Sequence, residues 1–239
     1  MNLIITMAGR SMRFKNEGYK IPKYLLPWGE MPVLCKILGE LTKNRDFDNV
    51  FLIANKKDDA YMPHVHKIMD KLDIPLDHLF LIDSTKSQAG DAAVGITKIN
   101  ARFDELKGSI CFHNIDTILY NRDLWKIENL LWENDGYIDT FQSNNHSYSY
   151  VIEKDGLLVD IAEKIVISNT ATSGLYGFSS AEMYLEHYDE QQYISEVYRK
   201  MLKNGKRIRI GSRHTEMDTI VLGTPSAYSA SAYILDLRM

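Results

Sequence analysis

The residues best suited to chemistry lie near the beginning of the chain, where the apolar stretch Leu3–Met7 runs into the small-residue turn Ala8-Gly9-Arg10-Ser11. Arg13 follows the turn, and Lys23 comes ten residues later, directly after Pro22. A strand that ends in a tight cationic turn places free backbone N–H groups and positive charge together, as polyphosphate binding requires. Taken alone, the segment is better explained as an ordinary strand–turn–helix opening with two solvated cations, so its partners along the chain decide.

A candidate metal ligand, Asp116, follows the apolar stretch Ser109–Asn114. A carboxylate at the end of a buried strand is costly to desolvate unless a cation meets it, and Mg²⁺ is the usual cation near phosphates. An aspartate in this position also commonly forms a turn or caps a helix. The cationic turn at the first strand favours the metal role.

Two further segments have residue types that can contact a ligand. In Gln88-Ala89-Gly90-Asp91-Ala92 the small residues let a flat ring lie against the backbone, and Gln88 offers a donor and an acceptor to a base edge. The alternative is a loop that leads into a helical turn. Glu163-Lys164 can meet a hydroxyl or amine and a phosphate, although an exposed ion pair at a strand end is common and contributes little energy. Ser173–Phe178 contains Gly174 and Gly177, which indicate a bulge or close backbone approach.

The first half of the chain alternates strand and helix patterns, which must position these groups. The expected strands are Leu3–Met7, Asn49–Ala54, His78–Ile82 and Ser109–Asn114, and the expected helices are Met31–Lys43, Tyr61–Leu72 and Asp91–Asn100. Buried strands separated by helices predict a doubly wound parallel sheet with helices on both faces. Ligands of such sheets bind at the carboxyl ends of the strands, where Arg10–Lys23, Asp83–Asp91 and Asn114–Asp116 would meet.

The second half predicts antiparallel or mixed strands laid beside that sheet. The expected strands are Tyr137–Gln142, Tyr148–Glu153, Leu157–Ala162, Ile208–Ile210 and Thr219–Leu222, and the expected helices are Met183–His187 and Ile194–Asn204. No Pro/Gly/Ser-rich linker and no repeat divides the chain. We therefore expect a single domain, residues 1–239, with halves at 1–125 and 126–239.

The composition argues against several classes of protein. A formal net charge of −4 gives no electrostatic reason to expect nucleic acid or an anionic membrane as partner. Cys35 and Cys111 stand far apart without a paired motif, so disulfides and zinc are not expected and a reducing cytoplasm fits. We find no signal-peptide pattern, and no apolar stretch approaches the roughly 20 residues that span a bilayer. We expect a cytoplasmic protein, with a homodimer left open.

The motifs together resemble the nucleotidyltransferases that activate sugar phosphates and related phosphate monoesters. The resemblance runs in order through MAGRSMRF, IPKYLLP, QAGDA, HNID, the Glu-Lys pair with SGLYGF, YISEVYRKML and LGTPSAY, and so covers essentially the whole chain. It implies a Rossmann-like (GT-A-like) α/β domain with a mixed, mostly parallel sheet and helices on both faces. The implied reaction joins a nucleoside triphosphate to a phosphorylated small molecule and releases pyrophosphate.

The resemblance also implies roles for individual residues. Residues 1–125 would bind the nucleotide, through Ala8, Gly9, Arg10, Ser11, Gln88, Gly90 and Asn114. Residues 126–239 would bind the acceptor, through Glu163, Lys164 and Gly174. The implied catalytic residues are Arg13, Lys23 and Lys164, and Asp116 is the implied Mg²⁺ ligand. No general base is needed, because the acceptor phosphate is already an anionic nucleophile.

The chain departs from the family pattern at three places. Ser11-Met12 stands where the family usually has glycine and a small residue, and Tyr24 replaces the second proline of Pro-Lys-Pro. Val221 stands where the family commonly supplies a second metal carboxylate, two residues before Gly223-Thr224. Either the metal has one protein carboxylate, or a neighbour such as Asp218 or Glu216 takes its place, and we take Asp218 as the second candidate ligand.

The nucleotide base and the acceptor are left open by these residues. A sugar 1-phosphate is the default acceptor. Small transferases of the family that the chain resembles also use CTP with non-sugar phosphates such as phosphocholine, often for capsular or other surface polysaccharides. The shortness of the chain favours such a cytidylyltransferase over a sugar-1-phosphate uridylyl- or thymidylyltransferase. Tyr148, Tyr150 and Tyr176 either line an acceptor pocket or pack within strands. One alternative is a nucleotide-sugar-dependent glycosyltransferase, which normally has Asp-x-Asp where this chain has Asn114-Ile115-Asp116. The other is a non-catalytic nucleotide-binding relative.

Overall fold

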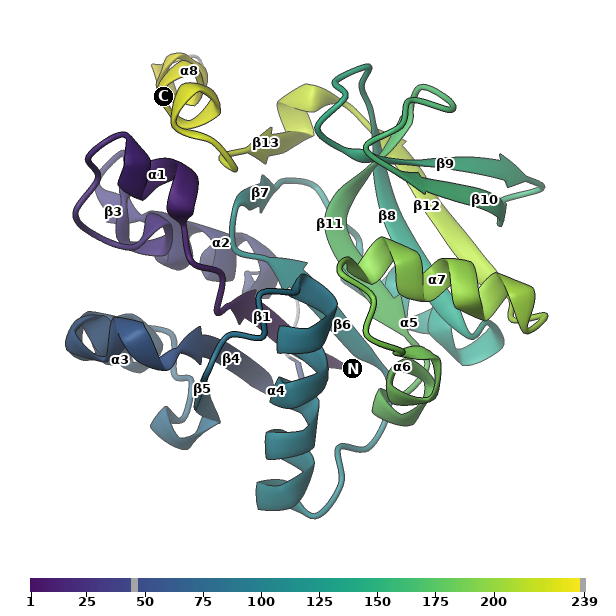
Figure 1. Ribbon diagram of the computed structural model, residues 1–239, viewed down its shortest axis with the longest axis horizontal. Coiled ribbons are helices and arrows are strands. Elements are labelled where there is room, and N and C mark those ends of the chain that lie inside the picture. The colour runs from purple at the N-terminus through teal and green to yellow at the C-terminus, as the bar shows by residue number, and fades with distance from the viewer. Residues whose placement is uncertain (44–46, 237–239) are drawn as a thin grey trace.

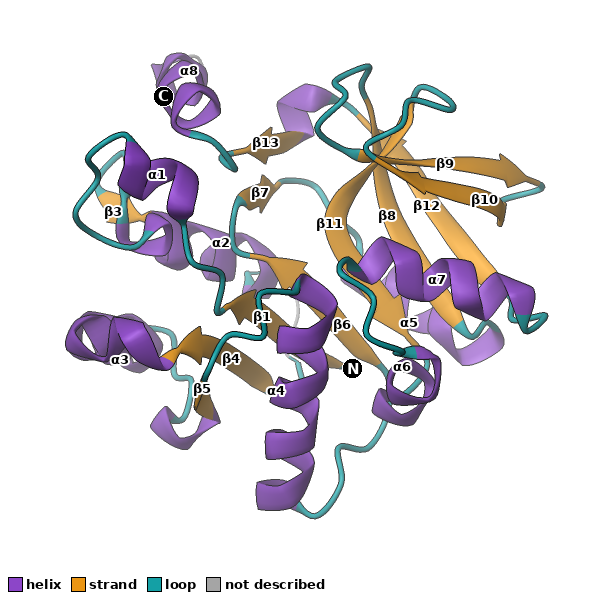
Figure 2. Ribbon diagram, viewed as in Figure 1, coloured by secondary structure: helices purple, strands orange, loops and turns teal. Residues whose placement is uncertain are grey.

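A nine-stranded mixed sheet forms the centre of the computed structural model, which describes residues 1–43 and 47–236 (Figures 1 and 2). In spatial order its strands are β5 (Leu79–Ile82), β4 (Val50–Asn55), β1 (Asn2–Met7), β6 (Ile110–Asn114), β11 (Thr170–Phe178), β8 (Gly136–Gln142), β12 (Ile208–His214), β10 (Leu157–Glu163) and β9 (Ser149–Lys154). The strands β5, β4, β1 and β6 are parallel, and β11 pairs with β6 antiparallel. The expected mixed α/β sheet is confirmed.

Helices cover both faces of this sheet (Figure 2). One apolar core includes α2 (Val33–Thr42), α3 (Met62–Lys71) and α5 (Leu124–Glu133), and the other includes α4 (Gln88–Phe103), α6 (Ala181–His187) and α7 (Ile194–Lys203). Leu3 and Ile5 of β1 belong to the first core and Ile4 to the second. Successive side chains of a strand point to opposite faces, so a run of apolar residues without alternation is buried on both sides.

Several shorter elements surround the carboxyl ends of the parallel strands. A separate two-stranded sheet joins β7 (Thr117–Leu119) to β13 (Thr219–Val221), and a second one joins β2 (Pro27–Trp28) to β3 (Met31–Pro32). The remaining helices are α1 (Met12–Asn16) and α8 (Pro225–Asp236), with 3-10 turns η1 (Lys23–Leu25), η2 (Lys56–Tyr61), η3 (Leu76–His78) and η4 (Glu216–Asp218). Within the described ranges, no helix is both long and apolar enough to span a membrane.

The central strand β11 was not expected as a strand. It is buried along its whole length, so its sequence lacks the alternation that marks a half-exposed strand. Its pairing with β8 shifts register between Thr172 and Tyr176, and Gly174 in between has φ +92. The bulge indicated by the glycines is therefore confirmed. Helices α5 and α8 were likewise not expected.

The boundary of α4 also differs from the expected Asp91–Asn100 in a way that matters for the ligand. The helix begins at Gln88, because the Ser87 hydroxyl caps it and accepts the Gly90 N–H at 2.9 Å. Gln88 therefore projects from a rigid first turn and not from a loop. The two halves of the chain are also joined, since β7 from the first pairs with β13 from the second.

Candidate active site

A cleft of two adjoining hollows opens at the carboxyl ends of β1, β5 and β6. The first hollow, about 370 Å³, is lined by Thr6, Ala8–Phe14, Lys23, Ser84, Lys86–Gln88, Asp91, Asn114–Asp116 and Gly223. The second hollow, about 230 Å³, is lined largely by residues of the second half, among them Asn145, Ser147–Ser149, Glu163, Lys164, Thr172–Gly174, Tyr176 and Tyr193. Both are lined by Arg13, Gln88, Asn114, Asp116 and Gly223. The segments singled out in the sequence therefore meet in one place.

The turn after β1 forms one wall of the first hollow. Its backbone is held by Asn55, whose Nδ2 donates to the Ala8 carbonyl at 2.9 Å. Ser11 has φ +52, a left-handed conformation that favours glycine, so serine here tightens the turn at a cost in backbone strain. Arg13 is exposed on α1, and its Nη1 donates to the Gly223 carbonyl at 3.4 Å. The turn thus presents a cation across the cleft.

Lys23 and Asp116 form an ion pair where the two hollows meet. Lys23 Nζ lies 2.7 Å from Asp116 Oδ2, and both side chains are partly buried. Burial by itself would raise the pKa of Asp116, but the charge and hydrogen bond of Lys23 outweigh it and hold that pKa below its ordinary value. The carboxylate is therefore ionised at neutral pH, and a positive charge already faces it.

Gln88, Asn114 and Gly174 contact one another on the wall between the hollows. Gln88 Nε2 donates to Asn114 Oδ1 at 2.7 Å, and Gln88 Oε1 accepts the Ile194 N–H at 3.4 Å. A Cβ on Gly174 would lie 2.8 Å from Asn114 Nδ2, so no larger residue fits without movement. Gly90 is different: it is buried behind Ser87, Thr85 and Tyr188, outside both linings.

Glu163 and Lys164 lie on the far side of the second hollow. Glu163 Oε2 accepts the hydroxyls of Ser149 and of Ser195, the latter at 2.7 Å. Lys164 Nζ lies 3.6 Å from Glu163 Oε1, hydrogen-bonds with the Tyr193 hydroxyl and lies 4.1 Å from the centre of that ring. Lys164 has φ +56, and its N–H donates to the Tyr148 carbonyl at 3.1 Å. The backbone thus turns this ammonium group toward the hollow.

The structure adds lining residues to which the sequence analysis gave no individual role. In the first hollow these are Ser84, Lys86 and Asp91. Asp91 accepts hydrogen bonds from Ser84 and Thr85, and burial raises its pKa. In the second hollow Tyr193 is new; of the three tyrosines considered, Tyr148 and Tyr176 line it. Ser84, Lys86 and Asp91 lie in the segment Asp83–Asp91 and Tyr193 begins the motif YISEVYRKML, but the sequence gave none of these four residues an individual role.

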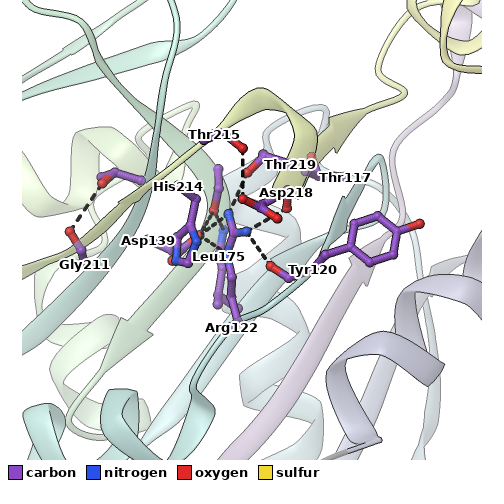
Figure 3. Close-up of polar contacts among 12 residues, drawn as sticks. Thr117, Tyr120, Arg122, Asp139, Leu175, Gly211, His214, Thr215, Asp218 and Thr219 are labelled. Atoms are coloured by element: carbon purple, nitrogen blue, oxygen red, sulfur yellow. Dashed lines mark hydrogen bonds and ion pairs between the residues drawn. The ribbon is translucent and has the colours of Figure 1, made fainter. Parts of the chain in front are cut away.

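Asp218 does not lie beside Asp116, which corrects its assignment as a second metal ligand. Its carboxylate accepts the Thr215 hydroxyl at 2.9 Å (Figure 3). It also accepts the Asn121 amide at 2.9 Å. The strands β7 and β13 pair antiparallel although they are far apart in the sequence, and we call this two-stranded unit the β7–β13 hairpin. In it the Leu222 N–H donates to the Asp116 carbonyl, and the Tyr120 N–H donates to the Asp218 carbonyl. The two aspartates are thus four positions apart along the hairpin, roughly 13 Å.

Gly223, two residues after the end of β13, lies beside the Asp116 carboxylate. A Cβ built on Gly223 would lie 3.3 Å from Asp116 Oδ2, and its next contacts lie at 3.8 Å or more. Val221, the position considered from the sequence, pairs with Thr117 and lines the second hollow. A side-chain carboxylate at position 223 would therefore lie close to that of Asp116, and this chain has a glycine there.

His113 is expected to make folding stability pH-dependent. It is fully buried, and burial lowers its pKa from 6.5 to about 4. Nε2 lies 2.7 Å from the Thr117 carbonyl, and no described residue offers Nδ1 a hydrogen-bond partner. The unfolded chain therefore takes up a proton at higher pH than the folded one, so stability falls as pH drops from 6.5 toward 4. Between pH 7 and pH 5 the expected loss is roughly 2 kcal/mol.

Urea denaturation at the two pH values measures this effect. His113→Gln keeps an N–H donor for Thr117 and should remove most of the His113 contribution. His64→Asn, at an exposed position of α3, is the matched control and should leave the wild-type pH dependence intact. An unchanged pH dependence in His113→Gln would show that another group is responsible.

Solved structures with the same fold include two sugar-nucleotide pyrophosphorylases and a CTP transferase. A nucleoside-diphosphate-sugar pyrophosphorylase from Vibrio cholerae RC9 superposes with TM-score 0.83 and 23% identity over 98% of this chain and 100% of its own. An inositol-1-phosphate CTP transferase from T. maritima superposes with TM-score 0.73 and 12% sequence identity, over 98% of this chain and 94% of its own. A UDP-glucose pyrophosphorylase superposes with TM-score 0.75 and 14% sequence identity, over 100% of this chain and 99% of its own. No protein-family model and no curated protein matches the chain. These likenesses show the fold.

Proposed function

We propose that the protein is a nucleotidyltransferase, which transfers an NMP from an NTP to a phosphorylated small molecule and releases pyrophosphate. The observation that carries the proposal is the pair of adjoining hollows with Lys23 and Asp116 where they meet. One hollow has the small-residue turn and Arg13, which suit a triphosphate. The other has Glu163 and Lys164, which suit a hydroxylated phosphate monoester.

CTP is the donor we favour, and surface polysaccharide biosynthesis is the role. One structural neighbour is an inositol-1-phosphate CTP transferase, which supports a cytidylyltransferase. The pyrophosphorylase neighbours support the alternative, a sugar-1-phosphate uridylyl- or thymidylyltransferase. The cytoplasmic location is part of the proposal, and the burial of Cys35 and Cys111 in the first apolar core is consistent with it.

The residues of the cleft can perform this transfer without a general base. An oxygen of the acceptor phosphate forms a bond to the α-phosphorus, while the bond from that phosphorus to the bridging oxygen breaks and pyrophosphate leaves with the electron pair. Lys164 draws the acceptor phosphate into the second hollow, and Arg13 and Lys23 balance the charge on the triphosphate. Because the two substrates repel each other, alignment and cations lower the barrier most.

The ligand atoms at this position suit Mg²⁺, because Asp116 places a carboxylate oxygen between the two hollows and Mg²⁺ prefers oxygen ligands. In the part of the chain that the structure describes, no group of three or more His, Cys, Asp or Glu side chains could hold a metal ion. Asp116 would therefore be the protein ligand, and phosphate oxygens and water would complete the set. When bound, the ion supplies neutralisation of phosphate charge.

Gly223→Asp is expected to lower the Mg²⁺ concentration needed for half-maximal activity by about tenfold, because it adds a carboxylate facing Asp116. Mn²⁺ binding to the nucleotide-loaded protein, followed by electron paramagnetic resonance, gives a readout independent of turnover. Gly223→Asn is the control, since it has the same size without the charge. If Gly223→Asp bound Mn²⁺ no better than Gly223→Asn, the facing geometry would not be the one that governs metal affinity.

A two-step assay tests the function. Melting temperature is first measured with CTP, UTP, dTTP, GTP and ATP in the presence of Mg²⁺, since a ligand that binds only the folded state raises it. Pyrophosphate release is then measured with inositol 1-phosphate, glucose 1-phosphate and phosphocholine. Binding without release from any pair would favour the non-catalytic alternative, and sugar transfer from a nucleotide sugar would favour the glycosyltransferase.

A further inference from the structure

The hairpin of β7 and β13 that presents Asp116 is not part of the main sheet. It has its own two-stranded sheet with three residue pairs, and it presents Asp116 before β7 and Gly223 after β13. Ile118 and Ile220 anchor it in the first apolar core. Apolar packing is non-directional, so these side chains alone leave the angle of the hairpin poorly determined. The contact of His113 Nε2 with the Thr117 carbonyl holds the end near Asp116, and a directional contact at the other end would fix the angle relative to the second hollow.

Arg122, two residues beyond Tyr120, supplies such contacts (Figure 3). Its Nη1 donates to the carbonyls of Tyr120 at 2.8 Å and Asp218 at 2.7 Å, and its Nη2 donates to Thr219 Oγ1 at 2.7 Å. The guanidinium therefore grips both strands of the hairpin at the end opposite Asp116. A planar guanidinium with donors in fixed directions is suited to hold a backbone at a set angle.

Asp139 of β8 ties this grip to the wall of the second hollow. Its Oδ2 accepts Arg122 Nε at 2.9 Å and the Ser173 hydroxyl at 2.6 Å. Ser173 is the neighbour of Gly174, and both line the second hollow. A chain of hydrogen bonds thus runs from the Asp116 hairpin through Arg122 and Asp139 to the second hollow.

The burial of this pair argues for positioning more than for stability. The side chains of Arg122 and Asp139 are 2% and 0% exposed. A buried ion pair rarely stabilises a protein more than apolar residues of the same volume would, because desolvating two charges is costly. What distinguishes an ion pair from apolar residues is that its hydrogen bonds have fixed directions. Here these bonds connect the β7–β13 hairpin, which presents Asp116, to Ser173 in the lining of the second hollow.

We propose that Arg122 and Asp139 are positioning residues that align the Asp116 hairpin with the acceptor wall for in-line transfer. The inference rests on the proposed function, in which an error of about 1 Å between the two phosphates costs roughly a hundredfold in rate. Neither residue lines either hollow. Their role is to hold the cleft's two walls at the reacting distance.

The principal test is the double variant Arg122→Met/Asp139→Leu, which removes both charges and so leaves neither one buried alone. We expect kcat to fall about 10- to 100-fold while the dissociation constant of the NTP changes less than about twofold. Tyr198→Phe is the matched control: its buried hydroxyl bonds the carbonyls of Tyr137 and Gly177 on the same two strands, β8 and β11, away from the hairpin. It should lower stability without lowering kcat.

Thr219→Val provides a milder variant in case the double variant does not fold. It removes one hydrogen bond to Arg122 at nearly constant volume, outside both linings. We expect kcat to fall about threefold to tenfold with unchanged nucleotide affinity. A folded double variant, or Thr219→Val, with wild-type kcat would overturn the proposal.

Hydrogen exchange separates the failure of this inference from the failure of the proposed function. The amides of Tyr120 and Leu222 are bonded within the hairpin, and both should exchange faster in Thr219→Val and in the double variant, with β1 amides unchanged. If the wild-type protein transfers no nucleotide, the proposed function fails. Unchanged exchange at Tyr120 and Leu222 would then overturn the positioning role on its own.

Discussion

Replacing Lys23 with methionine is expected to lower kcat by about 100- to 1,000-fold while the protein remains folded. Lys23 Nζ lies 2.7 Å from Asp116 Oδ2 at the junction of the two hollows, where the proposed function places the nucleotidyl group during transfer. Each preorganised charge aimed at developing charge in the transition state typically contributes this much to the rate. The pair is partly exposed, so its loss changes the free energy of unfolding by little.

Single-turnover kinetics with the best NTP and acceptor measure this effect apart from product release. Lys20→Met, at an exposed position three residues earlier, is the matched control and should turn over at the wild-type rate. Arg13→Met should show a smaller loss, because its guanidinium is exposed and its hydrogen bond to the Gly223 carbonyl is long, at 3.4 Å. Near-normal turnover by Lys23→Met would contradict the role given to this lysine.

Replacing Lys164 with methionine is expected to raise the acceptor KM by about 100-fold and leave the NTP KM nearly unchanged. The ammonium is turned into the second hollow and held beside Glu163 and Tyr193. A charge-assisted contact to a phosphate acts on the acceptor before the chemical step, so its loss is seen mainly in acceptor binding. We expect only the acceptor KM to change because, in the proposed function, the NTP and the acceptor bind in different hollows.

Initial rates over a matrix of NTP and acceptor concentrations give both KM values. Lys154→Met, at the exposed far end of the β9–β10 hairpin, is the control and should match the wild type. Glu163→Gln should keep the phosphate contact and lose affinity only for acceptors with free hydroxyls or amines. Equal increases in both KM values for Lys164→Met would argue that the hollows do not correspond to separate substrates.

The position of the cleft was largely determined by local sequence. Leu3–Met7 is apolar without alternation, so it must be a strand buried on both faces, and the small residues after it must turn. The same argument places Asn114 and Asp116 at the end of the neighbouring strand, and parallel strands end at one edge. The turn after β1, Gln88 and Asp116 could therefore be assigned to one cleft. Glu163 and Lys164 were assigned to it by the family resemblance, and the structure brings all of these residues together.

Contacts between distant segments were decided by the tertiary structure. Whether Asp218, Val221 or Gly223 faces Asp116 depends on the register of a hairpin whose strands are about a hundred residues apart, and a shift of one residue moves a side chain to the other face. The central strand β11 gave no alternating pattern because it is buried on both faces. Arg122 and Asp139 have no local signature either, because the value of a buried charge depends on the partner that folding brings to it. Local patterns thus determined the elements and the chemistry of the cleft, and long-range register determined which side chains face one another across it.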